Sequence, residues 1–345
     1  MKKHTGVYKY ILSGAFLLAA CNSIFAGGEP GVEKKKTYSK SYPLNGSDKV
    51  SINNQFGEVK IATWSKNEVR VDVTITGRGS TEERAQQILD LISIEDGKGS
   101  DGVFFKTNMK NQTWKGDKKG GSNGMEINYE VQMPAGNPLS LKNSFGSTFV
   151  PDMSGAVEIV SKFGELTAGK LANVKKLEVE YGTATVESVN NADVVINFSQ
   201  AQIGKMSGSI KTSQSYSGVK LTLDNSVTSF TVKNEFTDLL LDVSTDLSAN
   251  FDIYTNFSEL KNKTGFTIRE EAEDHSGIKF DHQYMGKSGN AGINVKVKSN
   301  FGDVTIGHNL PFDVNDDKDR DEKPEKKEKR EKKEKAEKKE KVTII

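Results

Sequence analysis

Histidines and paired carboxylates are the residues of this 345-residue chain whose types could hold a metal ion. Asp274-His275 and Asp281-His282 stand seven residues apart, and His308 follows. A metal site would require these ligands to converge on one point. The segment around them is polar and rich in turn residues, so we predict a hairpin loop there and no metal site.

Two other patterns are incomplete versions of ligand-binding loops. Gly286-Lys287-Ser288 matches the end of a phosphate-binding loop, but Asp281 stands where that loop requires glycine. The acidic run from Asp313 to Asp321 alternates like a calcium loop, but Lys318 and Pro324 occupy the places of its glycine and glutamate. We therefore predict no catalytic residue, no cofactor and no metal. An acidic pair of the glycosidase type is the alternative that residue types alone leave open.

Cys21 is the only cysteine and the one residue with a predicted covalent modification. Residues 1–26 have the pattern of an export signal, with Lys2, Lys3 and Lys9 before an apolar run too short to span a bilayer. Leu18-Ala19-Ala20-Cys21 resembles a lipobox, in which the cysteine sulfur receives a lipid. We expect an outer-membrane lipoprotein anchored at Cys21. Cleavage after Ala26 is the alternative and would give a periplasmic or secreted protein.

Charge is distributed without a basic domain. The formal net charge is +1, which argues against a nucleic-acid partner. Residues 313–345 form a charged low-complexity tail, in which glutamate recurs every third residue from Glu325 to Glu340. This tail has no apolar face, so we expect a solvated helix or a disordered segment. A basic surface that contacts anionic lipid or polysaccharide is the alternative.

Residues 141–309 form a repeat domain, because one aromatic residue returns at nearly constant spacing. The intervals are 18, 18, 17, 18, 20 and 21 residues, and a last copy follows 44 residues later. The positions are Phe145, Phe163, Tyr181, Phe198, Tyr216, Phe236, Phe257 and Phe301. Each unit holds two runs of alternating apolar and polar residues, which is the period of strands. The sequence therefore predicts an all-β fold.

Units of about 18 residues are too small to bury a core alone, so they must share one. We predict a β-solenoid-like stack of these repeats, in which like residues form ladders. An antiparallel β-sandwich of hairpins is the alternative. The solenoid predicts that the aromatics form an inward, structural ladder. A row of outward platforms for stacking a polysaccharide is the alternative.

Residues 40–140 differ from the repeats and are predicted to form a strand and helix cap region. Apolar residues at Ala85, Ile88, Leu89 and Ile92 have helical spacing, and Ser80 or Thr81 can cap that helix. Strand-like runs precede and follow it.

The order of these motifs resembles the bacterial putative-adhesin family of β-strand-repeat proteins, a domain of unknown function. NQFGEVKI at residue 54, the helix, NSFGSTFV at 143, the aromatic-glycine repeats and SNFGDVTI at 299 carry the resemblance, which covers residues 45–308. The resemblance implies surface adhesion through a glycan or protein ligand and supplies no catalytic residues. A structural or sensory envelope scaffold and a carbohydrate-active enzyme are the alternatives. The repeats at 197–240 depart from the pattern, because glycine no longer follows the aromatic.

Overall fold

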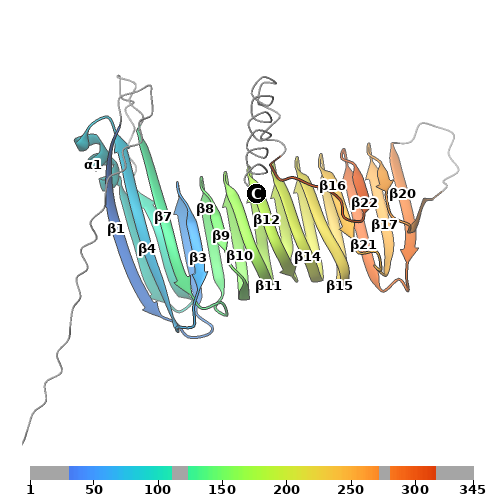
Figure 1. The fold of residues 1–345 in the computed structure, drawn as a ribbon, viewed down its shortest axis with the longest axis horizontal. Helices are drawn as coiled ribbons and strands as arrows, with labels where there is room; N and C mark the ends of the chain where they lie inside the picture. The colour runs from blue at the N-terminus through green and yellow to red at the C-terminus, as the bar shows by residue number, and fades with distance from the viewer. Residues whose placement is uncertain (1–30, 111–122, 272–279, 316–345) are drawn as a thin grey trace, which may run out of the picture. The chain divides into compact units, whose positions relative to one another are not determined.

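The computed structural model describes residues 31–110, 123–271 and 280–315 of the chain, which are almost entirely β (Figure 1). These residues contain 22 strands, connected through their pairings into one sheet, and one helix. The all-β prediction is confirmed. The one helix of the described residues is not long and apolar enough to cross a bilayer.

The amino-terminal part combines antiparallel strands with the helix. Strand β4 pairs in antiparallel fashion with β1 and β7, and β5 pairs in the same way with β6. The bounds are β1 Val32–Pro43, β4 Glu68–Gly79, β5 Ile92–Gly99, β6 Gly102–Met109 and β7 Gly124–Met133. Strand β1 has one partner and carries lysines at its surface, which discourage pairing with another chain.

Helix α1 (Glu82–Leu91) confirms the helix expected between these strands. Thr81 is the N-cap, and its hydroxyl accepts a 3.2 Å hydrogen bond from the Arg84 N–H. The buried face is Ala85, Ile88 and Leu89, and it packs against β4 and β1. At the other end, Lys36 donates to the carbonyl oxygens of Leu89 and Ile92, both at 2.6 Å.

The repeats supply two rows of strands that pair in parallel. The first row runs in the order β2 (Lys49–Gln55), β8 (Leu139–Ser144), β10 (Met153–Lys162), the second half of β11 (Glu165–Glu180), β13 (Asp193–Asn197), and the second halves of β14 (Gln200–Ser215) and β15 (Gly218–Glu235). The second row runs in the order β3 (Val59–Thr63), β9 (Thr148–Val150), the first half of β11, β12 (Thr183–Asn190), the first halves of β14 and β15, and β16 (Asp238–Val243). Each strand thus pairs with its counterpart one repeat away.

Pairing register follows the sequence period. Glu165 pairs with Thr183 and Thr183 with Gln200, which are offsets of 18 and 17 residues. Gln200 pairs with Gly218 and Gly218 with Asp238, which are offsets of 18 and 20 residues. A residue therefore meets the residue of the same repeat position in the next unit, as a ladder requires.

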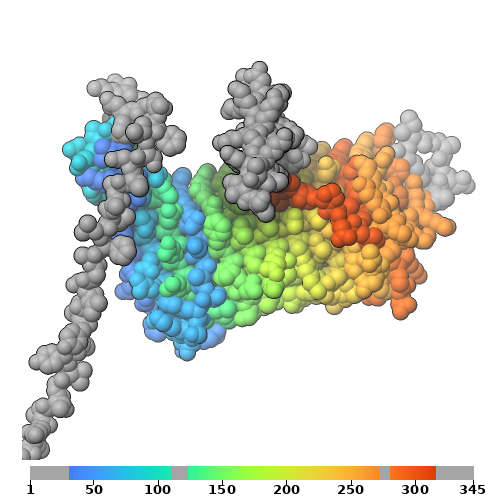
Figure 2. Space-filling view, in the orientation of Figure 1, coloured from blue at the N-terminus to red at the C-terminus, as the bar shows by residue number. Residues whose placement is uncertain are grey.

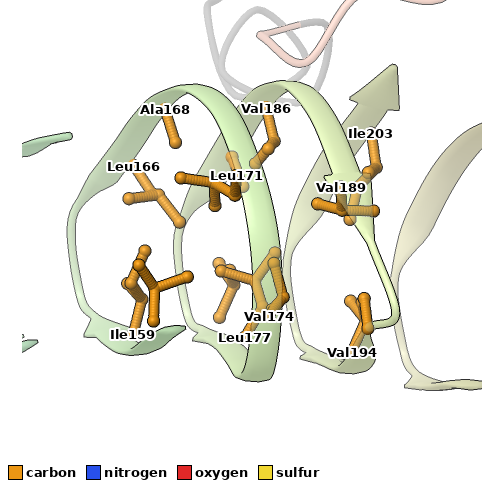
Figure 3. Close-up of a cluster of buried hydrophobic side chains, with 14 of the residues drawn as sticks. Ile159, Leu166, Ala168, Leu171, Val174, Leu177, Val186, Val189, Val194 and Ile203 are labelled. Atoms are coloured by element: carbon orange, nitrogen blue, oxygen red, sulfur yellow. The ribbon is translucent and has the colours of Figure 1, made fainter. Parts of the chain in front are cut away.

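The core lies between the two rows. Figure 3 shows side chains from successive units, among them Ile159, Leu166, Leu177 and Val194, pointing into the space that the chain encloses. Alternate residues of each strand are buried, as in β17 (Ala249–Asn256) and β21 (Ile293–Asn300). The shared core explains how units of this size are stable together.

The carboxyl-terminal strands do not stack in chain order. Strand β21 pairs in parallel with both β15 and β17, so it lies between two strands that precede it in the sequence. Strand β22 (Val304–Gly307) similarly pairs with β16 and β18 (Leu260–Asn262). The strands β20 (Asp281–Ser288) and β19 (Thr267–Glu270) add antiparallel pairings beyond β17.

Candidate functional site

Every aromatic repeat residue occupies a sharp corner where the chain leaves the first row for the second. At these corners the aromatic residue has φ between 48° and 65°, the left-handed region that residues with a side chain rarely adopt. Its N–H donates to the carbonyl of the next unit, as Phe163 does to Glu180 at 2.9 Å. The same unusual conformation at every corner fixes where each ring points.

The rings form one continuous stack, here called the aromatic ladder. Neighbouring ring centroids are 4.6–5.1 Å apart, and all but one pair lie within 8° of parallel. Its order is Phe56, Phe145, Phe163, Tyr181, Phe198, Tyr216, Phe236, Phe301, Phe257 and Phe280. Phe301 therefore stacks between Phe236 and Phe257, as the insertion of β21 requires.

The prediction of an inward ladder is wrong, because these rings lie on the outside. Phe163 is 46 % exposed and Phe198 47 %, and every ring from Phe145 onward is 45–54 % exposed. The left-handed corner is the physical reason. It turns the aromatic side chain outward, while the residue two places before it is buried, as Asn143 and Asn234 are.

The ladder presents ring edges to solvent rather than ring faces. A ring in the middle of the stack has a neighbour less than about 5 Å away on each face, which is stacking distance. A sugar that stacks on an aromatic residue needs an open face. The polysaccharide platform considered for these residues therefore does not fit the geometry of the inner rings, although their exposure does.

Buried polar side chains hold the corners from inside. The Asn143 amide donates to the carbonyl oxygens of Gly57 and Ser147 at 3.0 and 3.1 Å. The Asn234 amide donates to the Thr237 carbonyl at 2.6 Å. These bonds tie the asparagine side chains to the backbone carbonyl groups of the turn that follows. They explain why asparagine recurs two places before several ring positions.

Close backbone approach explains the glycine after the ring. A Cβ atom on Gly164 would lie 2.1 Å from the Gly146 carbonyl oxygen, and one on Gly182 would lie 2.0 Å from that of Gly164. Later units have serine in place of this glycine, and the serine hydroxyl accepts a hydrogen bond from the preceding unit. The Gly182 N–H donates to Ser199 Oγ, and the Ser199 N–H donates to Ser217 Oγ. The ring corners keep their conformation through residues 197–240, despite the departure seen in the sequence.

We expect Gly164→Ala to lower the free energy of unfolding by about 1–3 kcal/mol, the range for overpacked sites. The new Cβ would clash with main-chain atoms, which cannot move without disturbing the pairing above and below. Gly46→Ala is the matched control, since nothing lies within 4 Å of the Cβ it would add. Urea denaturation of both variants measures the difference, and equal midpoints would contradict the close approach.

Charged residues beside the ladder are paired with each other. Lys162 lies 3.1 Å from Glu178 and 2.7 Å from Glu180, and the hydrogen bond to Glu180 raises the pKa of Lys162. Burial opposes ionisation of Glu178, but hydrogen bonds from Lys176 and Lys162 lower its pKa overall. Lys162, Lys176 and Glu178 also line a hollow of ≈ 460 Å³ on the first row. One further lysine and one further glutamate line it, so side chains of both charge signs face this hollow.

A second hollow adjoins the ladder on the other row. It has a volume of ≈ 820 Å³ and lies between the rings of Tyr216 and Phe236 and the segment Pro311–Asp313. Figure 2 shows this red segment lying against the yellow strands. Residues 308–313 are called the strap below. Neither the strap nor the hollow was expected from the sequence, because they join residues about 90 positions apart.

The structure separates the residues that were tested for metal chemistry. His282 Nδ1 lies 2.8 Å from Glu270 across the β19–β20 pair, and His308 Nδ1 lies 2.7 Å from the Val243 carbonyl. Gly286-Lys287-Ser288 lies within strand β20. Within the described ranges, no group of three histidine, cysteine or acidic residues could hold a metal. Cys21, Asp274, His275 and residues 316–345 lie outside these ranges.

Comparison with known proteins gives structural neighbours alone. No protein-family model matches the chain, and no curated protein matches it. A putative cell adhesion protein from Clostridium sporogenes is 12 % identical, with 80 % of this chain and 100 % of that one covered and a TM-score of 0.26. A putative adhesin from Bacteroides fragilis is 12 % identical, with coverages of 79 % and 97 % and a TM-score of 0.37.

A third neighbour has a different name. A putative lipid binding protein from Parabacteroides distasonis is 11 % identical, with coverages of 78 % and 96 % and a TM-score of 0.31. The adhesion names agree with the family resemblance seen in the sequence. All three TM-scores are low, so these likenesses support no statement about ligand or activity.

Proposed function

We propose that this protein is a non-catalytic binding protein of the bacterial cell envelope, of the adhesin type, whose contact surface includes the aromatic ladder. The observation that carries the proposal is a continuous row of aromatic side chains that are about half exposed. Exposed large apolar side chains are costly unless a partner covers them. Nine of them in one line form a surface whose ring edges are available to an extended glycan or protein ligand.

The size of the exposed row supports this assignment. A phenylalanine or tyrosine has roughly 200 Å² of surface, so the nine half-exposed rings leave roughly 900 Å² accessible. The largest apolar patch on a typical monomer is about 300–600 Å² and is often functional. The ladder exceeds that range, and its position along the corner makes it accessible to a partner much longer than one unit.

Absence of catalysis is also part of the proposal. A glycosidase needs one carboxylic acid with a raised pKa and a second carboxylate at a fixed distance. Among the described acidic residues, each one with a clear shift has a lowered pKa; Glu126, for example, is hydrogen-bonded by Asn128 and Arg78. Hydrogen bonds or ion pairs stabilise the anionic form of these carboxylates, which suits a structural role better than proton transfer.

Export and anchoring complete the proposal. The signal pattern of residues 1–26 supports an envelope location, and the lipobox ending at Cys21 supports a lipid anchor in the outer membrane. An anchor at the amino end would leave residues 141–309 free to meet a ligand. The tail of residues 313–345 is proposed as a charged extension beyond the binding domain.

We infer further that the repeats wind as a β-solenoid, with one corner ring in each turn. Parallel pairing between counterparts of successive units supports this, as does the near-constant offset of 17–20 residues. An antiparallel sandwich of hairpins would instead pair consecutive runs within one unit. The amino-terminal strands and helix α1 would then close one end of the stack.

The test of function uses beads coated with the exported protein and surfaces that carry glycans or extracellular-matrix proteins. We expect adhesion to at least one surface, and at least a fivefold loss in the double variant Phe163→Asn/Phe198→Asn. Asparagine suits this corner, because Asn191 and Asn309 already adopt φ of 51° and 54°. Asparagine therefore preserves the backbone of the corner, and a thermal melt of the variant separates a loss of contact from the loss of stacking energy.

The matched control is Thr167→Asn/Thr185→Asn, which changes two exposed strand residues of the second row. This variant should adhere like the parent protein. If both double variants adhere equally well, the ladder is not the contact surface. If the parent protein adheres to none of the surfaces, the binding function itself is contradicted.

A further inference from the structure

The hollow between the ladder and the strap has a rigid far wall. Lys220 forms a 2.8 Å ion pair with Asp242, and both side chains are 13 % exposed. The same Lys220 amine donates to the Leu310 carbonyl at 2.5 Å, and Leu310 itself is buried. The Leu310 N–H donates to Asp242 at 3.3 Å. The strap is thus fixed to β15 and β16, and the hollow is preformed.

Apolar and hydrogen-bonding groups converge inside this hollow. Leu240, Pro311 and Phe312 supply apolar surface beside the ring edges of the ladder. Gln200, Asp238 and Asp313 supply hydrogen-bonding groups of both kinds. A volume of ≈ 820 Å³ is in the range of small-molecule sites.

The absence of a side chain at Gly218 leaves the space that the Gln200 side chain occupies. A Cβ atom on Gly218 would lie 2.1 Å from Gln200 Oε1 and 2.9 Å from Gln200 Cδ. The Gln200 amide therefore lies over the bare backbone of Gly218, on the floor of the hollow. A side chain at position 218 would push away the flexible end of Gln200 and leave the backbone where it is.

Charge narrows the class of ligand. The residues that line the hollow in the described part of the chain include two carboxylates and no lysine, arginine or histidine. An anionic ligand would be repelled. A cation would be attracted by the two carboxylates but would gain little from the ladder rings, because their negative faces are covered and their positive edges face outward; trilysine is therefore the competing probe. Hydroxyl groups can both donate to the carboxylates and accept from the Gln200 amide.

We infer that this hollow is a binding site for an uncharged oligosaccharide, with Gln200, Asp238 and Asp313 as its hydrogen-bonding groups. The inference rests on the proposed binding function and assigns it a ligand class and a local site. The ladder would contact the more distant parts of a long ligand, while the hollow would recognise two or three sugar units beside Tyr216 and Phe236.

The experiment is isothermal titration of the exported protein with cellotriose, chitotriose, mannotriose and xylotriose. A heparin tetrasaccharide and trilysine serve as the anionic and cationic probes. We expect one neutral trisaccharide to bind, and its affinity to fall at least tenfold in Gly218→Ala and in Asp238→Asn. Asparagine at 238 can still accept the Asp303 N–H that Asp238 accepts now. Gly46→Ala, far from the hollow, should bind like the parent protein.

Three results would overturn the inference. The first is that no neutral trisaccharide binds at concentrations up to about 10 mM, which is weaker than typical recognition. The second is that the two hollow variants bind the trisaccharide with the same affinity as the control. The third is that trilysine binds more tightly than any neutral trisaccharide. The ladder variant Phe163→Asn/Phe198→Asn should keep its affinity for the trisaccharide. If that variant loses adhesion while no trisaccharide binds the parent, the proposed function stands and the sugar site is wrong.

Discussion

Replacing Phe230 with alanine is expected to lower the free energy of unfolding by about 3–5 kcal/mol, the usual cost of removing a buried phenylalanine. Phe230 belongs to β15, is fully buried, and lies in the core between the two rows. Phe163→Ala is expected to lose about 1–3 kcal/mol, since it removes two stacking contacts of about 0.5–1.5 kcal/mol each. Urea denaturation with a common m-value provides the comparison.

Substituting tyrosine for phenylalanine distinguishes a buried ring from an exposed one more clearly than substituting alanine does. Phe163→Tyr should be nearly neutral, because Tyr181 already occupies the next ladder position and is 48 % exposed. Phe230→Tyr should cost about 1–3 kcal/mol, because it buries a hydroxyl without a partner. If both tyrosine variants were equally destabilised, the outward position of the ladder would be contradicted.

The contrast between Phe230 and Phe163 shows what the sequence could predict about this fold. Alternation of apolar and polar residues correctly indicates strands, and the ring spacing correctly indicates the pairing offset. The side on which a ring lies depends on φ at a single residue, which periodicity does not report. The glycine that follows several of the rings was the available signal, because a side chain there would meet the backbone of the neighbouring unit.

The order in which the units stack could not be predicted from the sequence, for a different reason. Phe301 follows Phe257 by 44 residues, and a regular repeat would place it further along the stack. The structure places it before Phe257, because β21 enters between β15 and β17. All of these strands carry the same pattern of alternation, so the pattern alone cannot specify which of them are neighbours.

The candidate site was predictable in part. The spacing of the aromatic residues indicates most of the ladder positions, but it predicts an interior location for them. The hollow was not, since it depends on a strap that returns across β15 and β16 and on the bond from Lys220 to Leu310. Contacts between residues 90 positions apart depend on tertiary structure, and no local motif in residues 308–313 indicates them.

Deleting one complete repeat, residues 164–181, is expected to leave a folded protein that unfolds cooperatively at a modestly lower temperature. In the proposed solenoid each unit would contact only its neighbours, so stability would be approximately a sum over units and their interfaces. The deletion joins Phe163 to Gly182 and keeps the sequence of one corner. Phe163 would then stack on Phe198, and β12 would pair with β9.

Deleting half a repeat, residues 164–172, is expected to abolish cooperative unfolding, although it removes fewer residues. It joins Phe163 to Asn173, so the first half of β11 is lost and the next strand arrives on the wrong row. Every later ladder contact and core contact would be out of phase with its neighbour. Circular dichroism and thermal melting of the two deletions measure the outcome. If the shorter deletion were the more stable of the two, or if neither folded, the solenoid arrangement of the repeats would be contradicted.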